Sequence, residues 1–69
     1  MFEPEEEVIY YLKQNGGREK IGTIADALHD NRGIDYQQTK AAITDLLCDK
    51  KIMFDQVAME VFIPRTDQA

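Results

Sequence analysis

The chain contains a single cysteine, Cys48, and this scarcity excludes several kinds of site. One cysteine cannot form an internal disulfide, and without a second one a zinc site of the Cys/His type cannot be assembled within one chain. So little cysteine is typical of proteins from a reducing compartment. We therefore expect a cytoplasmic protein, or a nuclear one in a eukaryote.

Long hydrophobic runs are also lacking. No apolar stretch approaches the ~20 residues that a membrane-spanning helix needs, so no membrane association is expected. The first residues, Met1–Glu7, are acidic, whereas a secretory signal begins with basic residues. With 69 residues, 43% of them hydrophobic, the sequence predicts one small globular domain over residues 4–63. Residues 64–69 are expected to form a flexible tail.

Basic side chains are outnumbered, with eight Lys and Arg against thirteen Asp and Glu and a net charge of −5. Such a balance weakens long-range attraction to phosphates. It does not exclude nucleic-acid binding, because the distribution of charge matters more than its sum. The acidic excess lies in residues 1–20 and 54–69, whereas residues 35–53 contain three acidic and three basic side chains. The central segment is therefore neutral.

Groups suited to catalysis are scarce as well. The only histidine, His29, lies in a polar segment, where a solvated or helix-capping role is expected. Gly16-Gly17 lacks the Lys-Ser/Thr that completes a phosphate-binding loop, and Cys48 is interpreted as a tolerated surface thiol. We expect no enzyme, no catalytic residue, no metal and no cofactor.

The first helix is predicted over about residues 4–15. Pro4 suits the first helical position, because its missing N–H would be unpaired there in any case. The glutamates at 5–7 complement the positive end of the helix dipole. Asn15 and the following glycines end the helix, since glycine readily adopts the left-handed conformation found at helix ends.

The second helix is expected to begin after a short charged loop, Arg18–Lys20. Ile21 is interpreted as a lone strand residue, and Gly22 or Thr23 as the cap of the helix. The buried face is expected to carry Ile24, Ala25 and Leu28. Gly33 should end this helix.

The third helix has the clearest signals in the chain. Asp35 is a good N-cap, and Gln38 three residues later completes a capping-box pattern. On a helical projection one side gathers Thr39, Ala42, Ile43, Leu46 and Leu47. The opposite side gathers Gln37, Ala41, Thr44 and Cys48. The sequence therefore predicts a capped amphipathic helix with its polar side free.

Two short strands are predicted after this helix, at 52–54 and 61–63, from their β-branched and aromatic residues. The intervening Asp55–Met59 lacks the Asn-Gly or Asp-Gly signal of a tight hairpin. Together the elements predict an α+β domain of three helices with a wing of two or three strands.

This order resembles the winged helix-turn-helix superfamily. The residues that carry the resemblance are Ile24-Ala25-x-x-Leu28, Gly33-Ile34-Asp35 and Thr39-x-x-x-Ile43-x-x-Leu46-x(5)-Ile52. The chain is similar to bacterial regulators of the multiple-antibiotic-resistance type. It is equally similar to the acidic C-terminal winged helix of the replication protein A middle subunit, a protein-docking module. It departs from the usual pattern at Lys50, where glycine commonly ends the reading helix, and in a wing without Lys or Arg.

The resemblance implies a module that reads duplex DNA with its third helix, as a transcriptional or replication-associated regulator and as a homodimer. Residues at the start of such a helix meet base edges in the major groove. The proposed contacts are Tyr36, Gln37, Gln38, Lys40 and Thr44, supported by Arg18, Lys20 and Arg32.

A second interpretation uses the same scaffold to bind protein. Val57 and Met59 at the predicted wing tip offer small apolar contacts, and methionine is adaptable at such surfaces. The acidic surface would then attract a partner with a basic surface. The module would be a docking domain, or a phage-type inhibitor or antirepressor that occupies a basic nucleic-acid-binding surface. Packing of Met59 into the domain itself is the alternative to this contact role.

Overall fold

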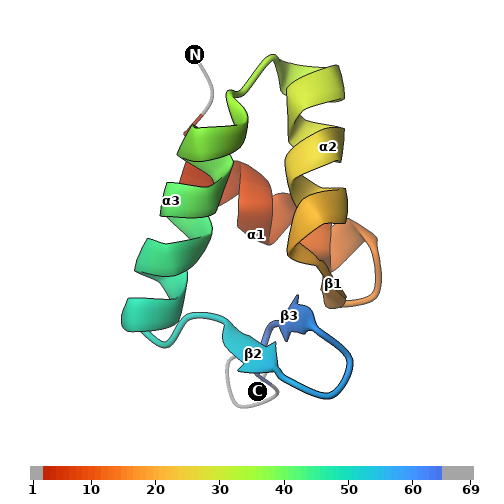
Figure 1. Cartoon of the computed structure of the whole chain (residues 1–69), viewed down its shortest axis with the longest axis vertical. Coiled ribbons are helices and arrows are strands. Elements are labelled where there is room, and N and C mark those ends of the chain that lie inside the picture. The colour runs from red at the N-terminus through yellow and green to blue at the C-terminus, as the bar shows by residue number, and fades with distance from the viewer. Residues whose placement is uncertain (1–2, 65–69) are drawn as a thin grey trace.

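Three helices and a three-stranded antiparallel sheet form the part of the chain that the computed structural model describes, residues 3–64 (Figure 1). The helices are α1 (Pro4–Gln14), α2 (Ile21–Arg32) and α3 (Tyr36–Cys48). The strands are β1 (Arg18–Lys20), β2 (Met53–Asp55) and β3 (Glu60–Phe62). The predicted α+β class is confirmed, and the layout is compatible with a winged helix. Of the predicted flexible tail, residues 65–69 lie outside the described residues.

Helix α1 ends as its glycines predict, one residue earlier than the expected boundary. Asn15 is the C-cap, and Gly16 and Gly17 have φ of 84° and 89°. The Gly17 amide donates to the Leu12 carbonyl at 2.7 Å, which satisfies one of the open carbonyls at the helix end. The Gly17 carbonyl in turn accepts from the Ile63 amide at 2.9 Å, so this turn also holds the end of the sheet.

The segment before α2 differs from the prediction. Arg18–Lys20, expected as a loop, is strand β1, and Ile21, expected as a strand residue, is the first residue of α2. The N-cap is Lys20, without a side-chain capping bond, and neither Gly22 nor Thr23. The reason is pairing with a distant segment: β1 is antiparallel to β3, more than forty residues later. Local sequence preferences carry no information about such a partner.

The sheet has the order β1-β3-β2, so β3 is central and β1 and β2 are its edges. Both hairpin strands are shifted by one residue from the predicted 52–54 and 61–63. Ile52, expected in a strand, is instead fully buried in the core just before β2. Its hydrophobic character therefore reflects packing and not strand pairing.

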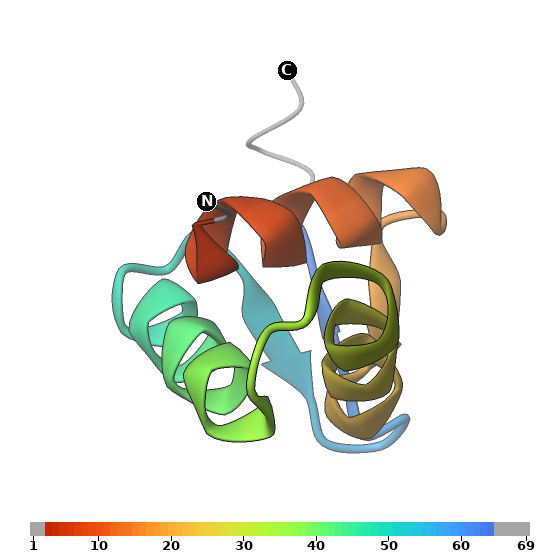
Figure 2. The same cartoon turned by 90° about the horizontal axis from the view of Figure 1, so that it is seen from above.

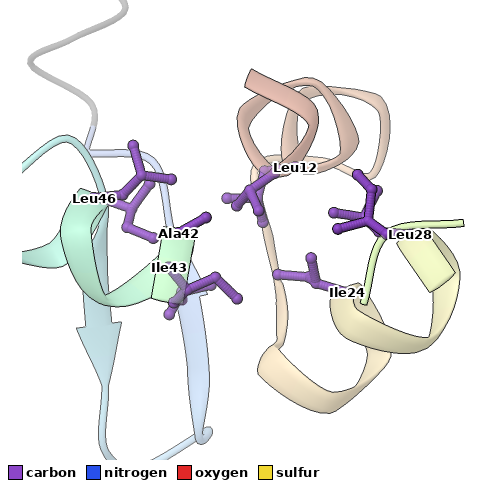
Figure 3. Packing of buried hydrophobic residues seen from close by; sticks show 10 residues of the cluster. Leu12, Ile24, Leu28, Ala42, Ile43 and Leu46 are labelled. Atoms are coloured by element: carbon purple, nitrogen blue, oxygen red, sulfur yellow. The ribbon is translucent and has the colours of Figure 1, made fainter. Parts of the chain in front are cut away.

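The core lies where the three helices meet the sheet. Helix α1 crosses one side of the α2–α3 pair, and the loop between β2 and β3 lies on the opposite side (Figure 2). Figure 3 shows leucine, isoleucine and alanine side chains of all three helices converging. Ile34, between α2 and α3, is buried as expected. Among the described helices none is both long and apolar enough to cross a membrane.

Candidate nucleic-acid or partner interface

Helix α3 divides into a buried and an exposed side, as its sequence pattern predicts. Asp35 and Gln38 form the predicted capping box, in which the Asp35 amide donates to the Gln38 side-chain oxygen at 3.3 Å. The buried residues of the helix are Thr39, Ala42, Ile43 and Leu46. The exposed residues on the opposite side are Gln37, Ala41, Thr44 and Cys48. Leu47, predicted to face inward, is only partly buried.

The first residue of α3 is tied to α2. The Tyr36 ring stacks on the His29 ring, with centroids 4.5 Å apart and planes 11° from parallel. A hydrogen bond with Asp26 raises the pKa of the Tyr36 phenol, and partial burial and the nearby Asp26 and Asp30 charges act in the same direction. Tyr36 and His29 therefore brace the turn between α2 and α3, a role for His29 that the sequence does not predict.

Two further predicted contact residues have local hydrogen bonds. The Gln38 side chain belongs to the capping box, and the Thr44 hydroxyl donates to the Lys40 carbonyl at 3.0 Å within the helix. Gln37 and Lys40 differ from them: both are exposed, and neither side chain has a hydrogen bond or ion pair within residues 3–64. Their polar groups are therefore available to an outside molecule.

Arg18, predicted to support DNA binding, connects the three strands. Its guanidinium pairs with Asp55 (Nη2–Oδ2, 2.6 Å) and Glu60 (Nε–Oε1, 2.7 Å), and its Cζ lies 5.3 Å from the Phe62 ring centroid. Hydrogen bonds to Glu60 and then Asp55 raise the pKa of Arg18. We call Arg18, Asp55 and Glu60 the wing clamp. The positive charge of Arg18 is thus offset by two carboxylates.

Arg32 and Lys20 complete the predicted supporting set, and the structure places them differently. The Arg32 Nε lies 2.9 Å from Glu7 Oε1 and joins the end of α2 to α1. Lys20 is exposed at the start of α2, and its backbone amide donates to the Glu19 carboxylate at 3.0 Å. Of the three supporting cations, Arg18 and Arg32 are therefore paired with carboxylates of the same chain, and Lys20 is exposed.

The tip of the wing is apolar and exposed. Val57 and Met59 are 96% and 61% exposed, so the alternative in which Met59 packs into the domain is wrong. Asp55 shapes this loop, because its Oδ1 accepts from the amides of Val57 and Ala58 at 2.9 and 3.1 Å. The hydrogen bond from the Ala58 amide is the largest cause that lowers the pKa of Asp55. The hydrogen bond with Arg18 and the bond from the Val57 amide act in the same direction.

An acidic groove of about 620 Å³ runs between the start of α1 and the end of α3. Its charged lining consists of Glu3, Glu5, Glu6, Glu7, Lys13 and Lys51. The described residues contain no group of three or more His, Cys, Asp or Glu side chains that could hold a metal. The groove adjoins the C-terminal end of α3, whereas Gln37 and Lys40 lie in the N-terminal half of this helix.

Two parts of this surface were not predicted: the wing clamp and the Tyr36–His29 stack. Both depend on side chains brought together by tertiary packing. The sequence signal that comes nearest to predicting the clamp is the opposite charge of Arg18 and of Asp55 and Glu60. This signal becomes informative only when the register of the strands is known.

No family model, curated protein or solved structure matches the chain.

Proposed function

We propose that this chain is a winged-helix module that reads duplex DNA with the N-terminal half of α3, as a small transcriptional or replication-associated regulator. The observation that carries the proposal is the pair Gln37 and Lys40. Both are exposed at the start of the helix that follows the α2–α3 turn, and neither has a side-chain partner within the described part of the chain. In this fold class the first residues of that helix meet base edges.

The chemistry of the two side chains suits the two kinds of contact. The glutamine amide can donate to and accept from adenine at once, which gives base readout. The lysine ammonium suits phosphate, which fixes the register of the protein on the duplex without reading sequence. Lys20 is a further exposed cation for the DNA backbone.

The test is titration of random-sequence duplex DNA, followed by fluorescence anisotropy at ~50 mM salt. Non-specific affinities of DNA-binding proteins are on the order of 10⁻⁴–10⁻⁶ M at physiological salt, so binding should be measurable. We expect Lys40→Glu to abolish binding and to leave thermal stability nearly unchanged, because Lys40 is exposed and has no ion pair to lose within residues 3–64. Lys13→Glu is the matched control, since it makes the same charge change on α1.

Salt dependence provides an independent measure. Contacts to about two to four phosphates predict a slope of about −2 to −4 for log Kobs against log salt concentration. Unchanged affinity in the Lys40→Glu variant would show that another surface binds DNA. A wild-type chain that fails to bind at high protein concentration would contradict the proposal.

The second candidate function is binding of a protein with a basic surface, and two observations favour it. Val57 and Met59 expose apolar side chains at the wing tip, and the charges of Arg18 and Arg32 are offset by carboxylates of the same chain. An acidic module of this kind would act as a docking domain, or as an inhibitor or antirepressor that occupies a nucleic-acid-binding surface. Failure of the DNA titration would favour this function.

A further inference from the structure

The two edges of the sheet differ sharply in character. Strand β1 is Arg18-Glu19-Lys20, charged at every position, and such side chains protect an edge from pairing with another chain. Strand β2 is Met53-Phe54-Asp55, in which Met53 is 44% and Phe54 38% exposed. Its one carboxylate is held by Arg18 and by amides of the wing loop. The β2 edge therefore lacks the protection that β1 has.

In the described part of the chain, the backbone of β2 is open along this edge. Strand β3 pairs with one side of β2, and no other described strand pairs with it. In an antiparallel ladder, alternate residues direct their N–H and C=O groups away from the existing partner. An edge of this kind can accept a further strand, with main-chain hydrogen bonds supplying affinity and side chains supplying specificity.

We propose that the occupant of this edge is a second copy of the same chain, whose β2 strand pairs antiparallel with the first about a two-fold axis near Phe54. Such a contact uses the same patch on both copies and closes as a dimer. Centred on Phe54, it places the two Phe54 rings across from each other. Met53 then faces Asp55 of the second copy. The exposed apolar groups of both strands are thereby shielded together, and methionine and aromatic residues are enriched in such interfaces.

The charges along the strand favour the two-fold arrangement. Lys50 and Lys51 precede β2 and have no side-chain ion pair within residues 3–64. The wing clamp at its other end combines two carboxylates with one guanidinium and retains net negative charge. Antiparallel pairing brings the lysines of each copy beside the clamp of the other. A parallel arrangement would instead set like charges together.

The inference does not rest on the proposed function, because it concerns a strand and not the exposed side of α3. A three-residue strand with a wing loop is small beside the ~1,600 Å² of a standard interface. We therefore expect a weak dimer, populated as the protein concentration rises.

Sedimentation equilibrium of the whole chain over a range of protein concentrations tests the inference, in the absence of DNA. The wild-type chain should pass from monomer to dimer. Phe54→Lys places two ammonium groups across from each other at the two-fold axis and should weaken dimerisation about tenfold or more, because the two copies then repel. Tyr10→Lys is the matched control: Tyr10 is 54% exposed on α1, and its replacement should leave dimerisation unchanged.

The charge arrangement has its own pair of variants. Lys51→Glu should weaken the dimer, whereas Lys13→Glu should not, although both lysines line the same acidic groove. Circular dichroism checks that each variant retains its helices. A chain that stays monomeric at every concentration would overturn the inference, as would a dimer that Phe54→Lys leaves intact. Loss of DNA binding by Lys40→Glu alone would leave it unaffected.

Discussion

At the scale of single residues, Thr39 is the one buried polar side chain among residues 3–64. Its Oγ1 has no hydrogen-bond partner there. The Asp35 carbonyl, one helical turn earlier, already accepts the Thr39 backbone amide at 3.1 Å. A buried hydroxyl that gives up water without a new partner costs about 1–3 kcal/mol in protein mutational data. The rest of the side chain fills space between α3 and the core.

Thr39→Val should therefore leave stability unchanged or raise it by up to about 1 kcal/mol, because it removes the hydroxyl and keeps the shape. Thr39→Ser is the comparison variant. It keeps the hydroxyl and removes a buried methyl group, so it should lower stability by about 1 kcal/mol. Urea unfolding of both variants measures the difference. A clear loss of stability in Thr39→Val would mean that the hydroxyl has a stabilising partner.

At the scale of elements, the end of α3 has the geometry of a glycine-terminated helix without the glycine. Lys50 has φ of 61°, in the left-handed region. The amides of Lys50 and Lys51 donate to the carbonyls of Leu47 and Leu46 at 3.1 and 2.9 Å, the bond pattern of a Schellman motif. The sequence departure noted at Lys50 is thus a change of residue and not of backbone.

Lys50→Gly should raise the free energy of unfolding by about 0.5–1 kcal/mol. The left-handed conformation costs a lysine roughly 1–2 kcal/mol, and the greater freedom of glycine in the unfolded chain offsets part of the gain. In a domain of this size that corresponds to about 2–8 °C in Tm. Lys51→Gly is the control, since Lys51 has no positive φ and should lose stability. Equal effects at the two positions would show that the end of α3 is not strained.

At the scale of the whole molecule, the wing clamp connects the first third of the chain to its last strands. Arg18 lies 37 residues from Asp55 and 42 from Glu60 along the sequence. These ion pairs connect β1 to β2 and β3 at the two residues that flank the wing loop. Because these side chains are partly exposed, water weakens their attraction, and the geometry matters more than the charge.

The clamp predicts a pH dependence of global stability. The pKa of Asp55 is lower in the folded chain than its ordinary value of 3.8, so the folded state binds fewer protons there. The contribution of Asp55 to the free energy of unfolding is therefore present above pH 3.8 and is lost as the pH falls through the folded-state pKa. Urea unfolding from neutral to acidic pH should show this loss. Asp55→Asn should flatten that part of the profile, whereas Asp45→Asn, on the exposed surface of α3, should not.

Local sequence alone determined the three helices, apart from the start of α2, and most of the inward side of α3. Capping signals, glycine stops and helical periodicity act over a few residues, so they are readable without the tertiary structure. Gln37 and Lys40 were predictable as exposed for the same reason. The residues placed less well, Arg18 and Tyr36, have partners on other elements. Their neighbours in sequence say nothing about the contact.

The tertiary structure alone decided which polar groups face outward unpaired and which strand edge is open. Strand β1 exists because β3 returns beside it, and Arg18 is an internal clamp because that register sets it against Asp55 and Glu60. Pairing between distant segments depends on the closure of the whole chain, which no local pattern encodes. The sequence thus determined the scaffold and the two sides of α3, and tertiary packing decided which charged side chains are paired within the molecule.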